Sequence, residues 1–203
     1  EFDRAISQAT KVIDMPSLPI SREGMRLFDF KRMAAAARAG WALDAYDRAP
    51  EGEGRGKLLD AARSYRDALA KVVEEAQPSR KLVEARLAFS DRDYIHAARL
   101  FKEYNDATQD RDPKALLLAA TTALRQASPQ PGVARDLVQK VLQINGDYVP
   151  AYVLLGEIAL NAGNSTEASR MAQAALEREP DNEQARRLAA TLKGESTSDD
   201  PVV

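Results

Sequence analysis

The segment from Asp147 to Asn182 constrains the fold most strongly, because its pattern describes two short helices joined by a turn. Tyr152, Leu155 and Gly156 place a ring, an aliphatic side chain and a small residue on one helical stripe. A turn follows at Asn161–Asn164, where the residues are Asn, Ala, Gly and Asn. A second stripe then runs to a proline, through Ala168, Ala172, Ala175, Leu176 and finally Pro180. The segment therefore predicts a helix-turn-helix unit.

The second stripe recurs further up the chain. Ala168 and Leu176 are matched, at one constant spacing, by Ala134 and Leu142 in the stripe Ala134, Val138, Val141 and Leu142. Similar stripes of rings, small residues and aliphatic residues appear at Tyr94, Ala97 and Phe101; at Ala61, Tyr65, Ala68 and Leu69; and at Phe2, Ala5, Ala9, Val12 and Ile13. One helix pair buries too little apolar surface to fold alone, so the recurrence predicts stacked helix pairs.

These stripes and their spacing resemble the tetratricopeptide repeat, a helix-turn-helix unit with a period of about 34 residues. The resemblance implies an all-α fold, a right-handed solenoid of antiparallel helix pairs. Helices approach within about 8–10 Å only where small residues lie at the crossing, and Gly156 fits such a position. A larger side chain at Gly156 is therefore expected to destabilise the fold by overpacking.

The expected repeat domain covers residues 1–194, and its repeats differ in length. It consists of a half repeat at 1–16, an extended irregular repeat at 17–77, three repeats at 78–114, 115–148 and 149–182, and a capping helix at 183–194. The half repeat resembles a second helix without its first. This indicates a fragment of a longer protein, or a neighbouring chain that supplies the missing helix. Residues 195–203, which are small and acidic, are predicted to be disordered.

Helix signals divide the domain further. The extended repeat begins with a long helix and continues through a glycine-rich loop at Glu51–Gly56. We expect the apolar stripe of the half repeat to pack on that long helix or on another copy of the chain. Helices are predicted at 3–14, 22–48, 57–76, 79–89, 93–106, 113–127, 132–144, 149–162, 165–178 and 182–193.

Composition excludes several classes of function. The formal charge is −2 and no basic stripe is present, which disfavours nucleic acid as a partner. No apolar run approaches the roughly 20 residues that cross a bilayer, so direct membrane insertion is not expected. The chain lacks cysteine, which rules out disulfides and thiolate chemistry. We expect a soluble protein, and the sequence leaves open whether its compartment is the cytoplasm or the periplasm.

No catalytic, cofactor-binding or metal-binding residues are predicted. His96 is the single histidine, and no nucleophile or carboxylate constellation is placed with it. A structural zinc site needs several histidine or cysteine ligands, which the sequence does not supply. Gly52, Gly54 and Gly56 form a loop without the Lys-Ser/Thr ending of a phosphate-binding loop. These observations predict a protein that is not an enzyme.

The resemblance to tetratricopeptide repeats implies a concave groove lined by the first helix of each repeat. In this family, extended or helical peptides lie in that groove. Carried over to this chain, the partner-binding residues are Leu82, Val83, Arg86, Phe89, Ala119, Ala120, Ala123, Gln126, Val153, Leu154, Glu157, Leu160, Asn161 and Arg187.

This set is apolar in its middle and lightly charged at its margins, so the expected partner is an apolar or amphipathic protein segment. The Lys and Asn clamp that some family members use for a C-terminal carboxylate is absent from the comparable positions. The alternative is that the small residues only pack helices and hold no ligand.

Two functions follow from this pattern. The first is a non-catalytic scaffold that binds a partner segment in the groove or associates with itself. The alternative is a regulatory or docking segment of a larger enzyme, or of a secretion or envelope assembly, whose activity lies outside these residues.

Overall fold

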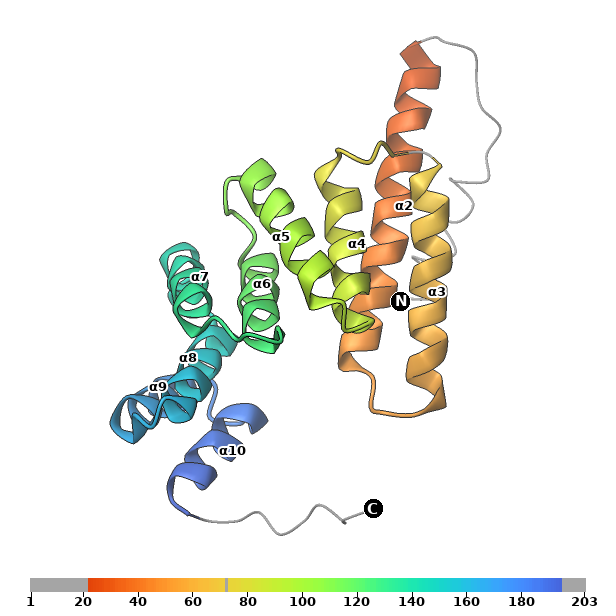
Figure 1. Ribbon diagram of the computed structural model, residues 1–203. Coiled ribbons are helices and arrows are strands. Elements are labelled where there is room, and N and C mark those ends of the chain that lie inside the picture. Colours follow the sequence, from red (N-terminus) through yellow and green to blue (C-terminus); the bar gives the residue numbers. More distant parts are fainter. Residues whose placement is uncertain (1–21, 72, 195–203) are drawn as a thin grey trace. The chain divides into compact units, whose positions relative to one another are not determined.

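The computed structural model describes residues 22–71 and 73–194, and their regular secondary structure is entirely helical (Figure 1). The helices are α2 (Arg22–Arg48), α3 (Glu53–Ala70), α4 (Pro78–Ser90), α5 (Tyr94–Thr108), α6 (Pro113–Arg125), α7 (Pro131–Ile144), α8 (Val149–Asn161), α9 (Ser165–Arg178) and α10 (Glu183–Leu192). The prediction of an all-α helical repeat fold is confirmed. The half repeat at 1–16, its helix at 3–14 and the tail at 195–203 lie outside the described residues.

The chain divides into two compact units, Glu1–Ala107 and Thr108–Val203. The division falls at the C-terminal end of α5. Helices α2 to α5 form the described part of the first unit, and α6 to α10 form the described part of the second. Each unit has a hydrophobic core of its own.

The first unit is built around the long antiparallel pair of α2 and α3, against which α4 packs. Arginines and tyrosines join the pair at two levels. The Arg38 guanidinium of α2 lies 4.1 Å from the centre of the Tyr65 ring on α3, and the Arg55 guanidinium of α3 lies 4.5 Å from the centre of the Tyr46 ring on α2. Alanines and leucines such as Ala39 fill the space between these levels. The C-terminal part of α2 is thus joined to α3 at two separate levels.

Helix α3 differs from its predicted span of 57–76, since it begins at Glu53 and ends at Ala70. The predicted glycine-rich loop therefore contributes the first turn of the helix. Gly52 takes a φ of +144°, which glycine tolerates, and starts the helix directly after the turn. At the other end, the helix ends at Ala70, six residues before the predicted end, and Val73, only 4% exposed, lies in the core.

The second unit contains the pairs α6–α7 and α8–α9, followed by α10. Side chains before the helices accept hydrogen bonds from the first free backbone N–H groups. Asp112 accepts from Lys114 N at 3.0 Å, and Asn164 and Asn182 cap α9 and α10 in the same way. Prolines occupy the first turns of α6, α7 and α8. Predicted and observed bounds therefore agree within one or two residues throughout this unit.

Each of the two helix pairs in the second unit also contains an ion pair at a similar place. Lys140 Nζ, on α7, lies 2.6 Å from an Asp110 carboxylate oxygen in the turn before α6. Arg178 Nε, on α9, lies 3.1 Å from an Asp147 oxygen in the turn before α8. The repeated arrangement ties the end of a second helix to the start of its own first helix.

Gly156 lies where α8 crosses α9 and α10. A Cβ atom added to Gly156 would be 2.5 Å from Leu188 Cδ2, 3.3 Å from Met171 Cβ and 3.5 Å from the Ala168 carbonyl oxygen. Even an alanine would thus force neighbouring atoms to move. The prediction that Gly156 occupies a close helix crossing is confirmed.

Candidate functional site

The predicted groove residues are divided between the two units. Four belong to the first unit and ten to the second. In the second unit they lie on α6, α8 and α10, except Gln126, which directly follows α6. These successive first helices contact one another in that order. The second unit therefore carries most of the candidate surface.

Half of the predicted residues in the second unit are buried. Ala120 is fully buried, and Ala123 and Leu154 join it in a core with residues of α7. Val153 packs with Ala175 and Ala185 in a second cluster, and Ala119 is also buried. These five side chains form a packed floor beneath the face of the first helices. A partner can reach these five side chains only if the core opens, so a partner of the folded unit contacts the accessible residues instead.

The accessible residues of the predicted set are mainly polar. Glu157, Asn161 and Arg187 are exposed, while Gln126 and Leu160 are half-buried. In the repeat register, Glu157 stands one repeat after Ala123, Leu160 one after Gln126, and Arg187 one after Val153. We name these five residues, Gln126, Glu157, Leu160, Asn161 and Arg187, the accessible face. Its polar character differs from the apolar groove that the sequence predicted.

Charges on the accessible face are partly satisfied within the chain. Arg187 forms an ion pair with Glu183, one turn away on α10, with 2.6 Å between Nη2 and Oε1. Although Glu157 reaches solvent, partial burial raises the pKa of its carboxyl, and the field of Arg125 on α6 opposes this shift only in part. Glu157 is the one carboxylate among these five residues, and the net effect on its pKa is a rise.

The predicted residues of the first unit are mostly engaged in packing. Val83 lies in the core, and the Phe89 ring packs edge-on against Tyr94 with 5.7 Å between ring centres. Arg86 is 7% exposed, and its guanidinium contacts Asp44 at 2.8 Å and Asp47 at 2.7 Å. Arg86 therefore fastens α4 to α2. Leu82 is half-buried and is the remaining member of this group.

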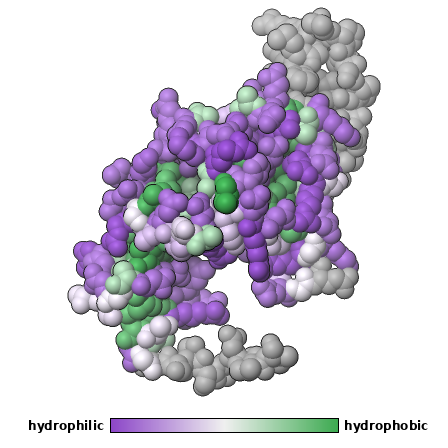
Figure 2. Space-filling model, in the orientation of Figure 1, coloured by the Kyte–Doolittle hydropathy of each residue, from purple (hydrophilic) through white to green (hydrophobic). Residues whose placement is uncertain are grey.

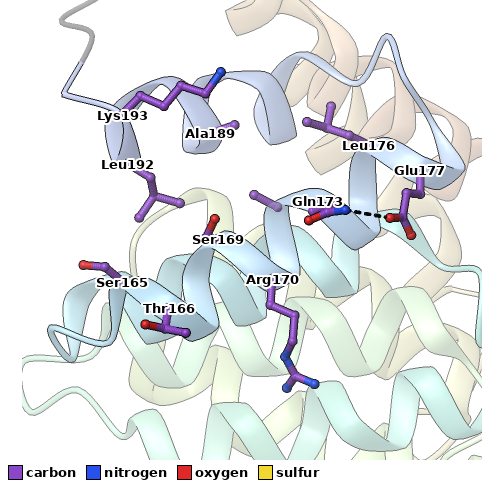
Figure 3. A pocket seen from close by; sticks show the side chains of 11 residues that line it. Ser165, Thr166, Ser169, Arg170, Gln173, Leu176, Glu177, Ala189, Leu192 and Lys193 are labelled. Carbon is purple, nitrogen blue, oxygen red and sulfur yellow. Dashed lines mark hydrogen bonds between the residues drawn. The ribbon is translucent and has the colours of Figure 1, made fainter.

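A hollow between α9 and α10 was not predicted from the sequence. It measures about 900 Å³, and Figure 3 shows Leu192 pointing from α10 toward α9 and Ser169 pointing from α9 toward α10. Its lining includes Ala172 and Ala189. One repeat earlier, the same positions hold Val138 and Leu155, which help to fill the core between α7 and α8. The smaller residues account for the hollow, and a comparison of the repeats would have revealed it.

Figure 2 shows a largely hydrophilic surface, on which hydrophobic residues appear in several separate patches. Among the residues that the structure describes, no group of His, Cys, Asp or Glu is placed to hold a metal ion. None of the helices formed by those residues is long and apolar enough to cross a membrane. His96 is exposed, and its Nδ1 lies 3.1 Å from an Arg99 guanidinium nitrogen.

Comparison with known proteins finds a family match within the second unit. The family model for the tetratricopeptide repeat matches residues 127–192, a span that covers α7 to α10. Residues 127–192 are therefore similar in sequence to tetratricopeptide repeats. The buried Gly156 and the alanines of α9 stand where these repeats need small residues.

The tetratricopeptide fold extends over most of the chain by structural likeness. A solved structure described as "YrrB: a TPR protein with an unusual peptide-binding site" matches with a TM-score of 0.58 and 11% sequence identity. The match covers 92% of this chain and 88% of that one. No curated protein matches the sequence. At this identity the likeness supports the fold, and the function has to be argued from the residues.

Proposed function

We propose that the second unit binds a segment of a partner protein on its accessible face, and that it acts as a non-catalytic scaffold. The observation that carries this proposal is the arrangement of Gln126, Glu157, Leu160, Asn161 and Arg187 above a packed floor of small and aliphatic residues. Tetratricopeptide repeats and a repeat-protein neighbour support a role in protein interaction. The neighbour is described as having a peptide-binding site, which makes a peptide-like ligand a reasonable expectation.

The accessible face favours an amphipathic segment. The amides of Gln126 and Asn161 donate and accept hydrogen bonds, so they suit the backbone or polar side chains of a ligand. Leu160 supplies apolar surface beside them. Because the floor is already packed, the ligand gains little from burying Ala120 or Leu154. Binding should therefore depend on polar contacts more than the sequence alone predicted.

A photo-reactive amino acid in place of Gln126 tests this proposal in the native cell extract. We expect a discrete cross-linked partner that disappears when Asn161→Arg is added on the neighbouring first helix. Gln139→Arg, at an exposed position on the second helix α7, is the matched control and should leave the cross-link intact. Circular dichroism confirms that both variants are folded. A cross-link that persists in the folded Asn161→Arg variant would overturn the proposal.

A further inference from the structure

The hollow between α9 and α10 lies beside a first helix that no described second helix covers. Helix α10 begins at Glu183, one repeat after Val149, the first residue of α8. By this register α10 is a first helix, and its equivalent α8 packs against the second helix α9 that follows it. Among residues 22–71 and 73–194, no second helix follows α10 in the same way. The hollow therefore marks an open second-helix position.

The stripe that α9 covers on α8 differs from the matching stripe on α10. Gly156 of α8 meets α9, and Ala159, one turn further along the same stripe, is fully buried. One repeat later these positions hold Ala190, which is half-buried, and Lys193, which is exposed and lines the hollow (Figure 3). The face of α10 that would meet a second helix is therefore accessible.

The half repeat at 1–16 lies outside the described residues, but its sequence carries the stripe of a second helix. This stripe has the spacing of the α9 stripe, with Ala5, Ala9, Val12 and Ile13 at the positions of Ala168, Ala172, Ala175 and Leu176. In α9 these positions are buried or half-buried. A helix with the same stripe needs the face of a first helix to bury it.

We propose that the half repeat of a second copy of the chain occupies the hollow, and that it pairs with α10 as α9 pairs with α8. Leu176 and Leu192 line the hollow and supply aliphatic surface for the stripe. Because paired helices run antiparallel, the start of the half repeat comes to the end of α10, where Glu1 and Asp3 approach Lys193. These opposite charges favour that direction of pairing.

The occupant is a second copy rather than the same chain, because each repeat in a stacked array contacts only its neighbours. The half repeat precedes α2, the hollow lies between α9 and α10, and the intervening pairs separate them in the sequence. Two different surfaces meet in the proposed contact, so it can extend from dimers to longer assemblies as concentration rises. The lining of the hollow contains none of the five residues of the accessible face, so this contact is independent of the proposed function.

Cysteine cross-linking between two copies tests the inference, because the chain has no cysteine of its own. A Cβ atom at Gly156 would lie 3.3 Å from Met171 Cβ, and the corresponding positions in the proposed pair are Ala190 and Gln8. This separation is near the range of about 3.5–4.5 Å that a disulfide needs between its Cβ atoms. We therefore expect a Gln8→Cys copy and an Ala190→Cys copy to form a mixed disulfide dimer in oxidised glutathione.

Two kinds of control make the cross-link specific. One copy carries a fused tag, which gives the mixed dimer a mass of its own. Gln184→Cys, at an exposed position on another side of α10, replaces Ala190→Cys and should give little mixed dimer. Val12→Asp places a charge in the stripe and should reduce the mixed dimer by about tenfold or more, because the charge would be buried without a partner. Ser7→Asp, which lies off the stripe, should leave it unchanged.

Several results would overturn the inference. One is a mixed dimer that forms equally well with Gln184→Cys or in a folded Val12→Asp variant. Another is the absence of a mixed dimer at the highest soluble concentration of both copies. The third is a doubly substituted chain, with cysteine at positions 8 and 190, that closes the disulfide within itself on dilution, since the occupant would then be the same chain.

Discussion

The two units hold a pair of antiparallel helices together in different ways. In the first unit, α2 and α3 contain 27 and 18 residues, and arginine–tyrosine contacts join them at two levels. In the second, α8 and α9 contain 13 and 14 residues and meet closely at Gly156. A long interface spreads its contacts, whereas a short pair concentrates them at one crossing. The second unit should therefore be much more sensitive to a single added side chain.

The two units also differ in how much space surrounds a glycine inside a helix. A Cβ atom on Gly40, in α2, would meet no heavy atom within 4 Å, whereas one on Gly156 would lie 2.5 Å from Leu188. Both glycines lie inside a helix, so both weaken it intrinsically. Only Gly156 is required by packing.

The largest expected effect is that of Gly156→Leu. The new side chain must displace Leu188 and Met171, and overpacking of this kind costs about 1–3 kcal/mol or more. Urea unfolding followed by circular dichroism measures the loss as a lower midpoint. An unchanged midpoint would show that α8, α9 and α10 do not pack closely at this residue.

In the first unit, Arg86→Met should produce the next largest loss. The variant keeps the length of the side chain but leaves Asp44 and Asp47 without its guanidinium. Because both aspartates are partly exposed, we expect about 1–2 kcal/mol rather than the larger cost of a fully buried charge. Arg66→Met, at a more exposed position on α3, is the control for the same measurement. Equal effects of the two variants would mean that Arg86 does not fasten α4 to α2.

Gly40→Ala should stabilise the first unit. Alanine is better than glycine in a helix interior by about 0.8–1.0 kcal/mol, and space is available for its methyl group. The corresponding Gly156→Ala variant should instead lower the midpoint. If both variants were stabilising, the second unit would not be more sensitive than the first to an added side chain.

The smallest expected effect concerns pH. A carboxyl group whose pKa is raised on folding favours the folded state when protonated, and this contribution is lost as pH rises through the raised pKa. Glu157→Gln should therefore raise the unfolding midpoint slightly at pH 7. The difference from the parent should vanish below the ordinary carboxyl pKa of about 4.3. A variant that is less stable than the parent at pH 7 would contradict the burial of this carboxyl group.

Prediction from sequence succeeded where the period is regular. The second unit repeats its stripes at a constant spacing, so the helix bounds and the role of Gly156 could be predicted. The irregular repeat at 17–77 offers no such reference, and the bounds of α3 were wrong at both ends. The partners of Arg86 lie on α2, and their separation from Arg86 in the sequence does not match the repeat period. The period therefore could not predict these contacts.

The candidate face was harder to predict than the fold. A small or aliphatic residue on a first helix can face either a ligand or the neighbouring helix, and periodicity alone does not separate the two. Ala120 and Leu154 were expected at the surface, but both are buried in the core that α6, α7 and α8 form together. Polar residues such as Asn161 are less ambiguous, because burying them without partners is costly.

The most direct test compares Ala120→Arg with Asn161→Arg in the same two measurements, the urea midpoint and the affinity for a peptide selected on the parent protein. Ala120 is fully buried and Asn161 is exposed. We predict that Ala120→Arg unfolds the second unit, whereas Asn161→Arg keeps the parent midpoint and loses the peptide. A folded Ala120→Arg variant that no longer binds, beside an Asn161→Arg variant that still does, would contradict a binding face formed by polar residues above a packed floor.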